Sequence, residues 1–306
     1  MSVLNDHAED YLRLRRSLGF KLERAERLLP QLVAYLEAAG AATVTSKLAI
    51  AWARLPERAQ PRHWAQRLAV ARGFARYLQA FDPAAEVPPP GVFPARRHRP
   101  APYLWSHSDI SRLLAAAREL RPPLRAATHE ALFGLLSASG MRIGEAIALQ
   151  RDDVDLTAGI ITIREAKFDR SRLVPLHPSV TQALTGYATA RDRLRPRPHA
   201  TTFFLSGAGT ALDRSGVGKV FRTLTTTIGV RTATVHPRVH DLRHSFAVET
   251  LIRWQRCGMH VDEHIAALST YLGHISPADT YWYLSASPEL MALAAERLHM
   301  RFGDRR

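Results

Sequence analysis

The sequence is poor in cysteine and lysine and contains no long apolar run. Cys257 is the only cysteine, which excludes an internal disulfide framework and suits a reducing cytoplasm. No apolar stretch approaches the roughly 18 residues of a membrane-spanning helix. The start, MSVLNDHAED, lacks the basic residues and apolar stretch of a secretory signal. We therefore expect no membrane partner and a cytoplasmic location.

The charge of the chain is strongly basic, with a formal net charge of +14. Such a surplus favours a polyanionic partner, and nucleic acid is the default candidate. Lysine supplies little of it, because only four of the 42 basic residues are lysines: Lys21, Lys47, Lys167 and Lys219. A lysine can release a proton near neutral pH and an arginine cannot. Lys167 is therefore a candidate proton donor.

Composition along the chain predicts two domains and a linker, as a length of 306 residues allows. Residues 1–82 carry apolar residues at helical spacing, interrupted near Leu18-Gly19-Phe20. Proline is dense in DPAAEVPPPGVFPARRHRPAP, so residues 83–102 predict an extended, basic linker. Residues 103–306 predict a second, larger domain that ends in a helix.

Within residues 103–306 the pattern predicts mostly helices and one hairpin. The run GIITIREAKFDRSRLVPL alternates apolar residues on both sides of a charged tip, which is typical of a β-hairpin. A short strand is predicted at Phe203-Phe204-Leu205, and one helix is predicted to follow HDLRHS. Further helices are predicted at about 108–118, 124–137, 179–195, 215–227, 263–272 and 288–301. The predicted fold class is mainly α with a small β-sheet (α+β).

Six polar residues share one chemical interpretation. Two guanidiniums present flat forks of donors that match phosphate oxygens. Two imidazoles and an amine can move protons near neutral pH, and a phenol with positive neighbours can act as a nucleophile. The six are Arg142, Lys167, His240, Arg243, His274 and Tyr283. Together they predict cleavage and rejoining of DNA without a metal or any other cofactor.

These residues lie in motifs that resemble the tyrosine recombinases of the phage-integrase family. The motifs ASGMRIGEAIAL, the lysine hairpin ending in RLVPL, HDLRHSFA and LGH-x8-Tyr follow in the family's order. The likeness covers about residues 103–300, and the helical N-terminal part resembles the family's core-binding domain more loosely. The phrases ALSTYLGH and ADTYWYLSASPELM are similar to recombinases carried by mobile elements.

The resemblance implies a role for each of the six residues. Arg142 and Arg243 would clamp the scissile phosphate. His240 and His274 would donate to its oxygens or handle the proton of the nucleophile. The nucleophile, Tyr283, would release a 5′-hydroxyl and form a 3′-phosphotyrosine, and Lys167 would protonate the leaving oxygen. Because that linkage conserves bond energy, rejoining would need no ATP.

Alternatives remain open for several of these residues. Tyr281 and Tyr271 are rival nucleophiles, although the nine-residue spacing from LGH favours the tyrosine at 283. Each arginine could instead cap a helix or pair with Glu145 or Asp241. The second histidine of HDLRH, His244, is expected to support the site rather than to react.

The resemblance also implies a fold and partners. Residues 1–82 would bind DNA and residues 103–306 would carry the chemistry, the two forming a C-shaped clamp on duplex DNA. Four protomers would act on two recombination sites through a Holliday junction, and the free protein would be a monomer or dimer. The C-terminal helix would pack on a neighbouring protomer or on its own. The protein would lie at the bacterial nucleoid, and the need for a partner recombinase or accessory protein stays open.

The expected function is integration or transposition of a mobile element. The alternatives are resolution of chromosome or plasmid dimers, as in Xer recombinases, and a catalytically silent DNA-binding regulator. Other signals are weaker. Cys257, His260 and His264 have a zinc-like spacing without a fourth ligand, and SGVGKV lacks the full phosphate-binding loop. The acidic cluster at residues 152–155 predicts a turn rather than a two-metal site.

Overall fold

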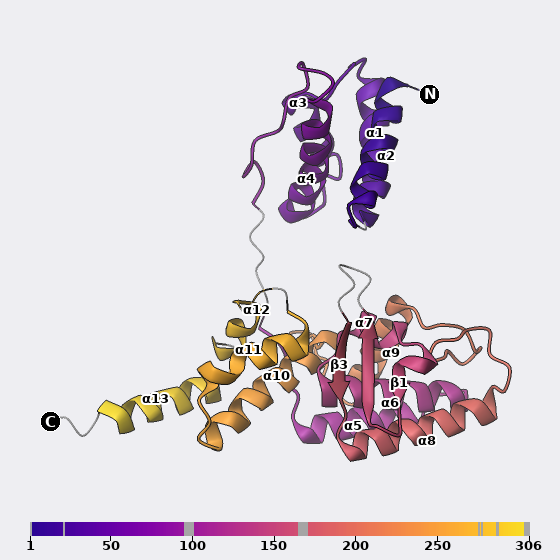
Figure 1. Ribbon diagram of the computed structural model, residues 1–306, viewed down its shortest axis with the longest axis vertical. Helices are drawn as coiled ribbons and strands as arrows, with labels where there is room; N and C mark the ends of the chain where they lie inside the picture. Colours follow the sequence, from indigo (N-terminus) through magenta and orange to yellow (C-terminus); the bar gives the residue numbers. More distant parts are fainter. Residues whose placement is uncertain are drawn as a thin grey trace. The chain divides into compact units, whose positions relative to one another are not determined.

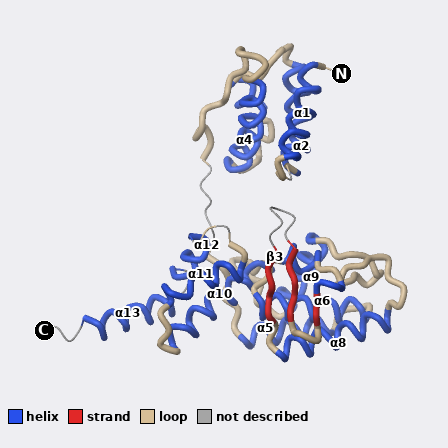
Figure 2. The backbone as a smooth tube through the Cα atoms, viewed as in Figure 1, coloured by secondary structure: helices blue, strands red, loops and turns tan. Residues whose placement is uncertain are grey.

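The computed structural model describes residues 2–20, 22–94, 101–164, 171–274, 276, 278–285 and 288–302. It divides into two compact units, Met1–Pro100 and Ala101–Arg306, and each has its own apolar core. Helices dominate both units, and one small antiparallel sheet lies in the second (Figures 1 and 2). The predicted fold class is therefore confirmed. Within these ranges no helix is both long and apolar enough to cross a membrane.

In its described residues, the first unit contains four helices whose apolar sides meet. Ser2 and Thr45 cap two of them by accepting hydrogen bonds from backbone N–H groups of the first turn. Trp52 and Phe74 are completely buried between the helices, and Arg67 lies 3.9 Å over the Trp52 ring. The helices are α1 (Val3–Ser17), α2 (Glu23–Ala38), α3 (Ser46–Arg54) and α4 (Pro61–Leu78).

The first part of the predicted linker packs on the first unit. Ala85 is buried, and the N–H of Glu86 donates to the carbonyl of Val44 over 2.8 Å. Arg72 donates to the carbonyls of Pro88 and Pro89 over 2.8 and 2.7 Å. Proline has no N–H but keeps its carbonyl, so the proline run is held through acceptors. Residues 95–100 lie outside the described residues.

The second unit is built around α6, which is buried on nearly all sides. Leu132, Phe133, Leu135 and Leu136 of this helix lie in the core, and α6 packs against α5, α8 and α10. The described helices of this unit are α5 (His107–Arg118), α6 (Pro123–Ser139), α7 (Ile143–Ala148), the 3₁₀ helix η1 (Arg151–Asp153), α8 (Pro178–Leu194), α9 (Arg214–Thr227), α10 (Val239–Arg256), α11 (Val261–Leu272), α12 (Ala278–Tyr281), the 3₁₀ helix η2 (Trp282–Ser285) and α13 (Pro288–Phe302).

The sheet contains the predicted hairpin. Strand β2 (Ile160–Arg164) pairs antiparallel with β3 (Ser171–Pro175), and the short β1 (Val154–Asp155) extends the order to β1-β2-β3. Ile161 lies opposite Val174, and both side chains are buried, which fixes the register. The hairpin prediction is confirmed at its paired residues, whereas its tip, residues 165–170, lies outside the described residues.

Two local predictions were wrong. Phe203–Leu205 is not a strand but an irregular segment flanked by isolated bridges at Thr202 and Leu205. Its rings are buried against Tyr187, so the apolar run reflects core packing rather than sheet pairing. HDLRHS does not precede a helix but forms the first turns of α10, because Asp241 accepts hydrogen bonds from Arg238 and closes the N-terminus.

Candidate active site

Arg142 lies at the start of α7, where its backbone and side chain share one acceptor. Its N–H donates to Glu145 Oε2 over 3.0 Å, and Nη1 donates to Oε1 over 2.7 Å. Nη2 donates to the carbonyl of Gly273 at the end of α11. The side chain stays 37% exposed. The guanidinium is thus held on one edge by protein acceptors and keeps an accessible surface.

Arg243 lies in the second turn of α10 and is buried. Nη1 donates to the carbonyl of Gly140 over 2.8 Å, and Nη2 donates to the carbonyl of Leu272 over 2.7 Å. Burial lowers its pKa, as does the charge of Arg142, whereas the nearby phenol of Tyr283 and the carboxylate of Glu145 oppose this change. The side chain therefore joins the ends of α6 and α11 to the tyrosine that the sequence singled out.

Two glycines make this arrangement possible. Gly140 ends α6 with φ +61, and Gly273 ends α11 with φ +67, in the left-handed region that favours glycine. A Cβ at Gly140 would lie 2.5 Å from the ring of Phe246, and one at Gly273 would lie 2.6 Å from Nη1 of Arg172. The motifs SGMR and LGH thus place a turn and a carbonyl acceptor directly beside the arginines.

His274 follows Gly273 and lies beside Tyr283. Its Nδ1 shares a 2.6 Å hydrogen bond with Oγ1 of Thr280, which is completely buried. Burial, followed by the charges of Arg243 and Arg142, lowers the pKa of His274 to about 4. The imidazole is therefore neutral near pH 7 and able to accept a proton.

The three rival tyrosines occupy different surroundings. Tyr283 is only 2% exposed, and its phenol lies close enough to Arg243 to oppose the lowering of that residue's pKa. The ring of Tyr271 stacks on Phe246 at a centroid separation of 5.7 Å. Tyr281 is 48% exposed. The structure brings Tyr283, rather than Tyr281, to the guanidinium of Arg243.

The two histidines of HDLRH connect the start of α10 to Tyr283. The rings of His240 and His244 meet edge to face with centroids 4.6 Å apart, and His244 lies 5.4 Å from the ring of Tyr283. His240 keeps an exposed side. Its pKa is nevertheless lowered, first by burial of the ring among its neighbours and then by the charges of His244 and Arg243.

Glu145 and Arg172 belong to the same cluster, although the sequence did not identify them as functional. Arg172, in β3, donates from Nη2 to Glu145 Oε2 over 2.7 Å and from Nε to the carbonyl of Tyr271 over 3.1 Å. From the sequence, Glu145 is identified only as an alternative ion-pair partner of an arginine. The available signal was position, since Arg172 opens the RLVPL run five residues after Lys167.

Three further predictions concern Lys167, a metal site and the acidic cluster at residues 152–155. Lys167 lies outside the described residues. In the described ranges no group of three or more histidine, cysteine, aspartate or glutamate side chains is arranged to hold a metal ion. Asp155 accepts hydrogen bonds from the N–H groups of Thr157 and Ala158, so part of the acidic cluster forms the predicted turn.

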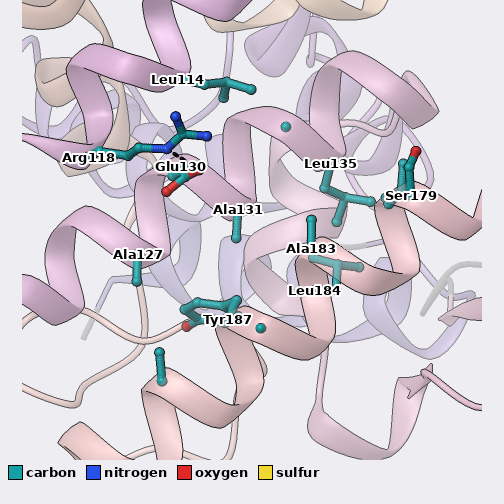
Figure 3. Close-up of a pocket in the computed structure, with 14 residues that line it drawn as sticks. Leu114, Arg118, Ala127, Glu130, Ala131, Leu135, Ser179, Ala183, Leu184 and Tyr187 are labelled. Atoms are coloured by element: carbon teal, nitrogen blue, oxygen red, sulfur yellow. Dashed lines mark hydrogen bonds and ion pairs between the residues drawn. The ribbon is translucent and has the colours of Figure 1, made fainter.

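An apolar hollow of about 490 Å³ lies elsewhere in the second unit, between α5, α6 and α8 (Figure 3). Its lining includes Ala127, Ala131 and Leu135 of α6 and Ala183 of α8. At one edge Arg118 and Glu130 form a 2.6 Å ion pair. The arginine and histidine cluster does not contribute to this lining, so the two features are distinct.

Comparison with known proteins gives a consistent result. The model of the Phage integrase family matches residues 105–289. The Sinorhizobium fredii (strain NBRC 101917 / NGR234) protein y4rB, named provisionally as an integrase/recombinase, is 46% identical over the full length of both chains. Tyrosine recombinase XerD of Listeria monocytogenes serovar 1/2a is 30% identical over 81% of this chain and 86% of its own.

A solved recombinase structure shares the fold of this chain. The integrase of transposon Tn1549, solved in complex with transposon right end DNA, superposes with a TM-score of 0.63 over 95% of this chain and 99% of that one. Its sequence identity is 18%, so this likeness concerns the fold. From the matched motifs, the relatives and the shared fold together, the chain belongs to the phage integrase family of tyrosine recombinases, enzymes of DNA strand exchange.

Proposed function

We propose that this chain integrates or transposes a mobile element by cleaving and rejoining DNA through a 3′-phosphotyrosine at Tyr283. One observation carries the proposal. The phenol of Tyr283 lies close enough to Arg243 to affect the pKa of its guanidinium, and the neighbouring Arg142 keeps a partly exposed guanidinium. A phosphodiester entering beside these two arginines would meet a nucleophile and two fixed cations at the same place.

The arginines would act mainly in the transition state. Negative charge grows there on the non-bridging oxygens of the phosphate, and donors already held in position stabilise it without rearranging. The carbonyls of Gly140, Leu272 and Gly273 hold both guanidiniums before DNA arrives. Loss of one such donor typically slows reaction by about 100–1,000-fold.

The chemical step would exchange one phosphate ester for another. The phenol oxygen of Tyr283 would attack phosphorus while the bond to the 5′-oxygen breaks. His274 would take the phenol proton directly or through His240 once the bound phosphate offsets the arginine charges that help to lower its pKa. Lys167, five residues before Arg172 in the hairpin, would deliver a proton to the departing 5′-oxygen. Rejoining would reverse these transfers, so neither a metal nor ATP is needed.

The partners follow from the same proposal. Residues 1–82 and the catalytic unit of one protomer would together clamp duplex DNA, and four protomers would act on two sites. The basic surplus of +14 supports a DNA partner. The first turn of α13 buries Leu290 in a cluster with residues of its own α10, whereas Met291 is 57% exposed and accessible to a neighbouring protomer. A cytoplasmic, nucleoid-associated location is part of this proposal.

A second role remains a candidate within the same chemistry. The match to XerD, at 30% identity over most of both chains, supports resolution of chromosome or plasmid dimers. The phrases ALSTYLGH and ADTYWYLSASPELM favour the mobile-element role. Mapping cleavage in the DNA that flanks the gene itself separates the two, because an element recombinase would cut at the element ends.

Covalent trapping on nicked DNA tests the shared chemistry. A nick near the cleavage site lets the leaving strand diffuse away, so the protein stays attached to the DNA. The wild-type chain and Tyr281→Phe should give an adduct that survives SDS and forms in EDTA, whereas Tyr283→Phe should give none. A wild-type chain that binds the site and never forms an adduct would instead be a DNA-binding regulator.

A further inference from the structure

Three consecutive carbonyls at the end of α11 each accept a hydrogen bond from a different arginine. The last carbonyls of a helix have no intrahelical donor and carry the negative end of the helix dipole. They are therefore suited to hold cations. The pairs are Tyr271 with Arg172 (3.1 Å), Leu272 with Arg243 (2.7 Å), and Gly273 with Arg142. Arg172 thus stands in the same row as the two arginines of the proposed phosphate clamp.

Glu145 connects Arg172 to Arg142 from the other side. Its Oε1 accepts from Arg142 and its Oε2 accepts from Arg172, each over 2.7 Å, and its side chain is only 13% exposed. Burial alone would raise the pKa of this carboxyl, but the hydrogen bond and charge of Arg172, followed by the contacts with Arg142, hold it below its ordinary value. One buried negative charge is therefore shared between two cations.

We propose that Arg172 is a positioning residue for strand cleavage, which engages Glu145 and the end of α11 so that Arg142 keeps its charge and orientation for the scissile phosphate. This inference rests on the proposed function. Arg172 is 13% exposed, compared with 37% for Arg142, so it lies deeper than the residue that would meet DNA. It acts through Glu145 and Arg142 rather than on the substrate.

The effect of Arg172 on Arg142 follows from the charges of the arginines and of Glu145. Arg142, Arg172 and Arg243 carry three positive charges and Glu145 carries one negative charge, so these four described side chains together carry +2. Without Arg172 the other three side chains together carry +1, and the buried carboxylate would lose one of its two arginine partners. A guanidinium held more strongly by its own carboxylate is a weaker and less accurately placed ligand for phosphate.

Arg172 also ties the lysine hairpin to the site. It lies at the start of β3, five residues after Lys167, and it bonds to the last turn of α11 at Tyr271, three residues before His274. Strand β3 and α11 pack against each other. Loss of Arg172 would therefore loosen two proposed catalytic segments at once, the base of the hairpin and the turn that carries His274.

A charge-compensation experiment tests the proposal. Single-turnover cleavage of a nicked suicide substrate is measured for the wild type, Arg172→Gln, Glu145→Gln and the double variant. Arg172→Gln should slow cleavage by about 10–100-fold, as expected from a misplaced catalytic group. The double variant should cleave faster than Arg172→Gln, because the uncompensated carboxylate is gone. Arg172→Lys, which keeps the charge, should lie between Arg172→Gln and the wild type.

A matched control separates this role from the general loss of an ion pair. Arg118→Gln and Arg118→Gln/Glu130→Gln remove an arginine–glutamate pair outside the cluster and should cleave like the wild type. Wild-type cleavage by Arg172→Gln would overturn the proposal. So would a double variant that is slower than Arg172→Gln, since two purely structural losses would add.

The proposal also has a test that needs no catalysis. Inorganic phosphate can be titrated into the free protein while the imidazole signals of His274 are followed by NMR. Arg172→Gln should weaken phosphate binding several-fold, and the double variant should restore part of it. Unchanged phosphate affinity in Arg172→Gln would overturn the positioning role. A wild-type chain that binds phosphate but forms no DNA adduct would count against the proposed function alone.

Discussion

The imidazole of His274 and the phenol ring of Tyr283 lie nearly parallel, with centroids 6.0 Å apart and planes inclined by 22°. Gly273 ends α11 in the left-handed conformation, and the short helices α12 and η2 then return the chain toward His274. The phenol lies close to Arg243, which also donates a hydrogen bond to the carbonyl of Leu272 at the end of α11. The nine-residue spacing thus places the proposed base, the proposed nucleophile and a proposed phosphate ligand within one small region.

Substitution of Gly273 should impair cleavage more than an equally strained substitution elsewhere. In Gly273→Ala the new methyl group must displace Arg172, whose Nη1 would lie 2.6 Å away. Gly258→Ala is the control, because Gly258 has φ +74 and open space around its Cβ position. Both variants should lose about 1–2 kcal/mol from the left-handed backbone. Only Gly273→Ala should also slow suicide-substrate cleavage, by roughly tenfold or more; equal rates would contradict the packing argument.

Arg243 should contribute to stability as well as to the reaction. Arg243→Ala would leave the carbonyls of Gly140 and Leu272 without their donor, and a buried unsatisfied group costs about 1–3 kcal/mol. Arg142→Ala should cost less, because that side chain is 37% exposed. Urea unfolding of the two variants measures this difference. A larger loss in Arg142→Ala would show that the burial of Arg243 has been misjudged.

The titration of His274 provides a prediction in the absence of DNA. Its folded pKa is about 4, whereas an unfolded histidine titrates near 6.5. Between these values the unfolded chain binds a proton that the folded site excludes, so the stability from neutral His274 is full above about pH 6.5 and is lost as pH falls toward 4. NMR titration of the imidazole should give a midpoint well below 6.5; an ordinary midpoint would contradict this account.

Occupation of the site by phosphate should shift the same titration upward. The positive charges of Arg243 and Arg142 help to lower the pKa of His274, and a bound phosphate would neutralise part of that charge. In Tyr283→Phe, bound to an uncleaved DNA site, the midpoint of His274 should therefore exceed that of the free variant. A midpoint unchanged by specific DNA would indicate that the phosphate lies elsewhere.

Local patterns predicted much of the fold. The helix boundaries follow from apolar periodicity and caps, and the hairpin follows from the alternation that buries Ile161 and Val174. The assignment of a strand at Phe203–Leu205 failed because a short apolar run is compatible with any buried backbone. The packing of Ala85 on the first unit was also missed, since it depends on acceptors in a proline run and on a distant arginine.

The sequence suggested which residue types make up the candidate site, but not which backbone carbonyls hold its arginines in place. Arg142 and Glu145 are three residues apart, so their pairing follows from helical spacing. The contact between Arg172 and Tyr271 joins segments 99 residues apart, and that between Arg243 and Gly140 joins segments 103 apart. Backbone carbonyls are present at every position, so the sequence does not indicate which ones will accept.

The most direct measurement is the identity of the residue attached to DNA. Adduct formed on a nicked site would be digested with protease and nuclease, and the nucleotide-bearing peptide would be sequenced by tandem mass spectrometry. We predict that the 3′-phosphate is esterified to the oxygen of Tyr283 in the peptide spanning TYWYL. Attachment at Tyr281, Tyr271 or any serine, or hydrolysis without a covalent intermediate, would contradict the central claim.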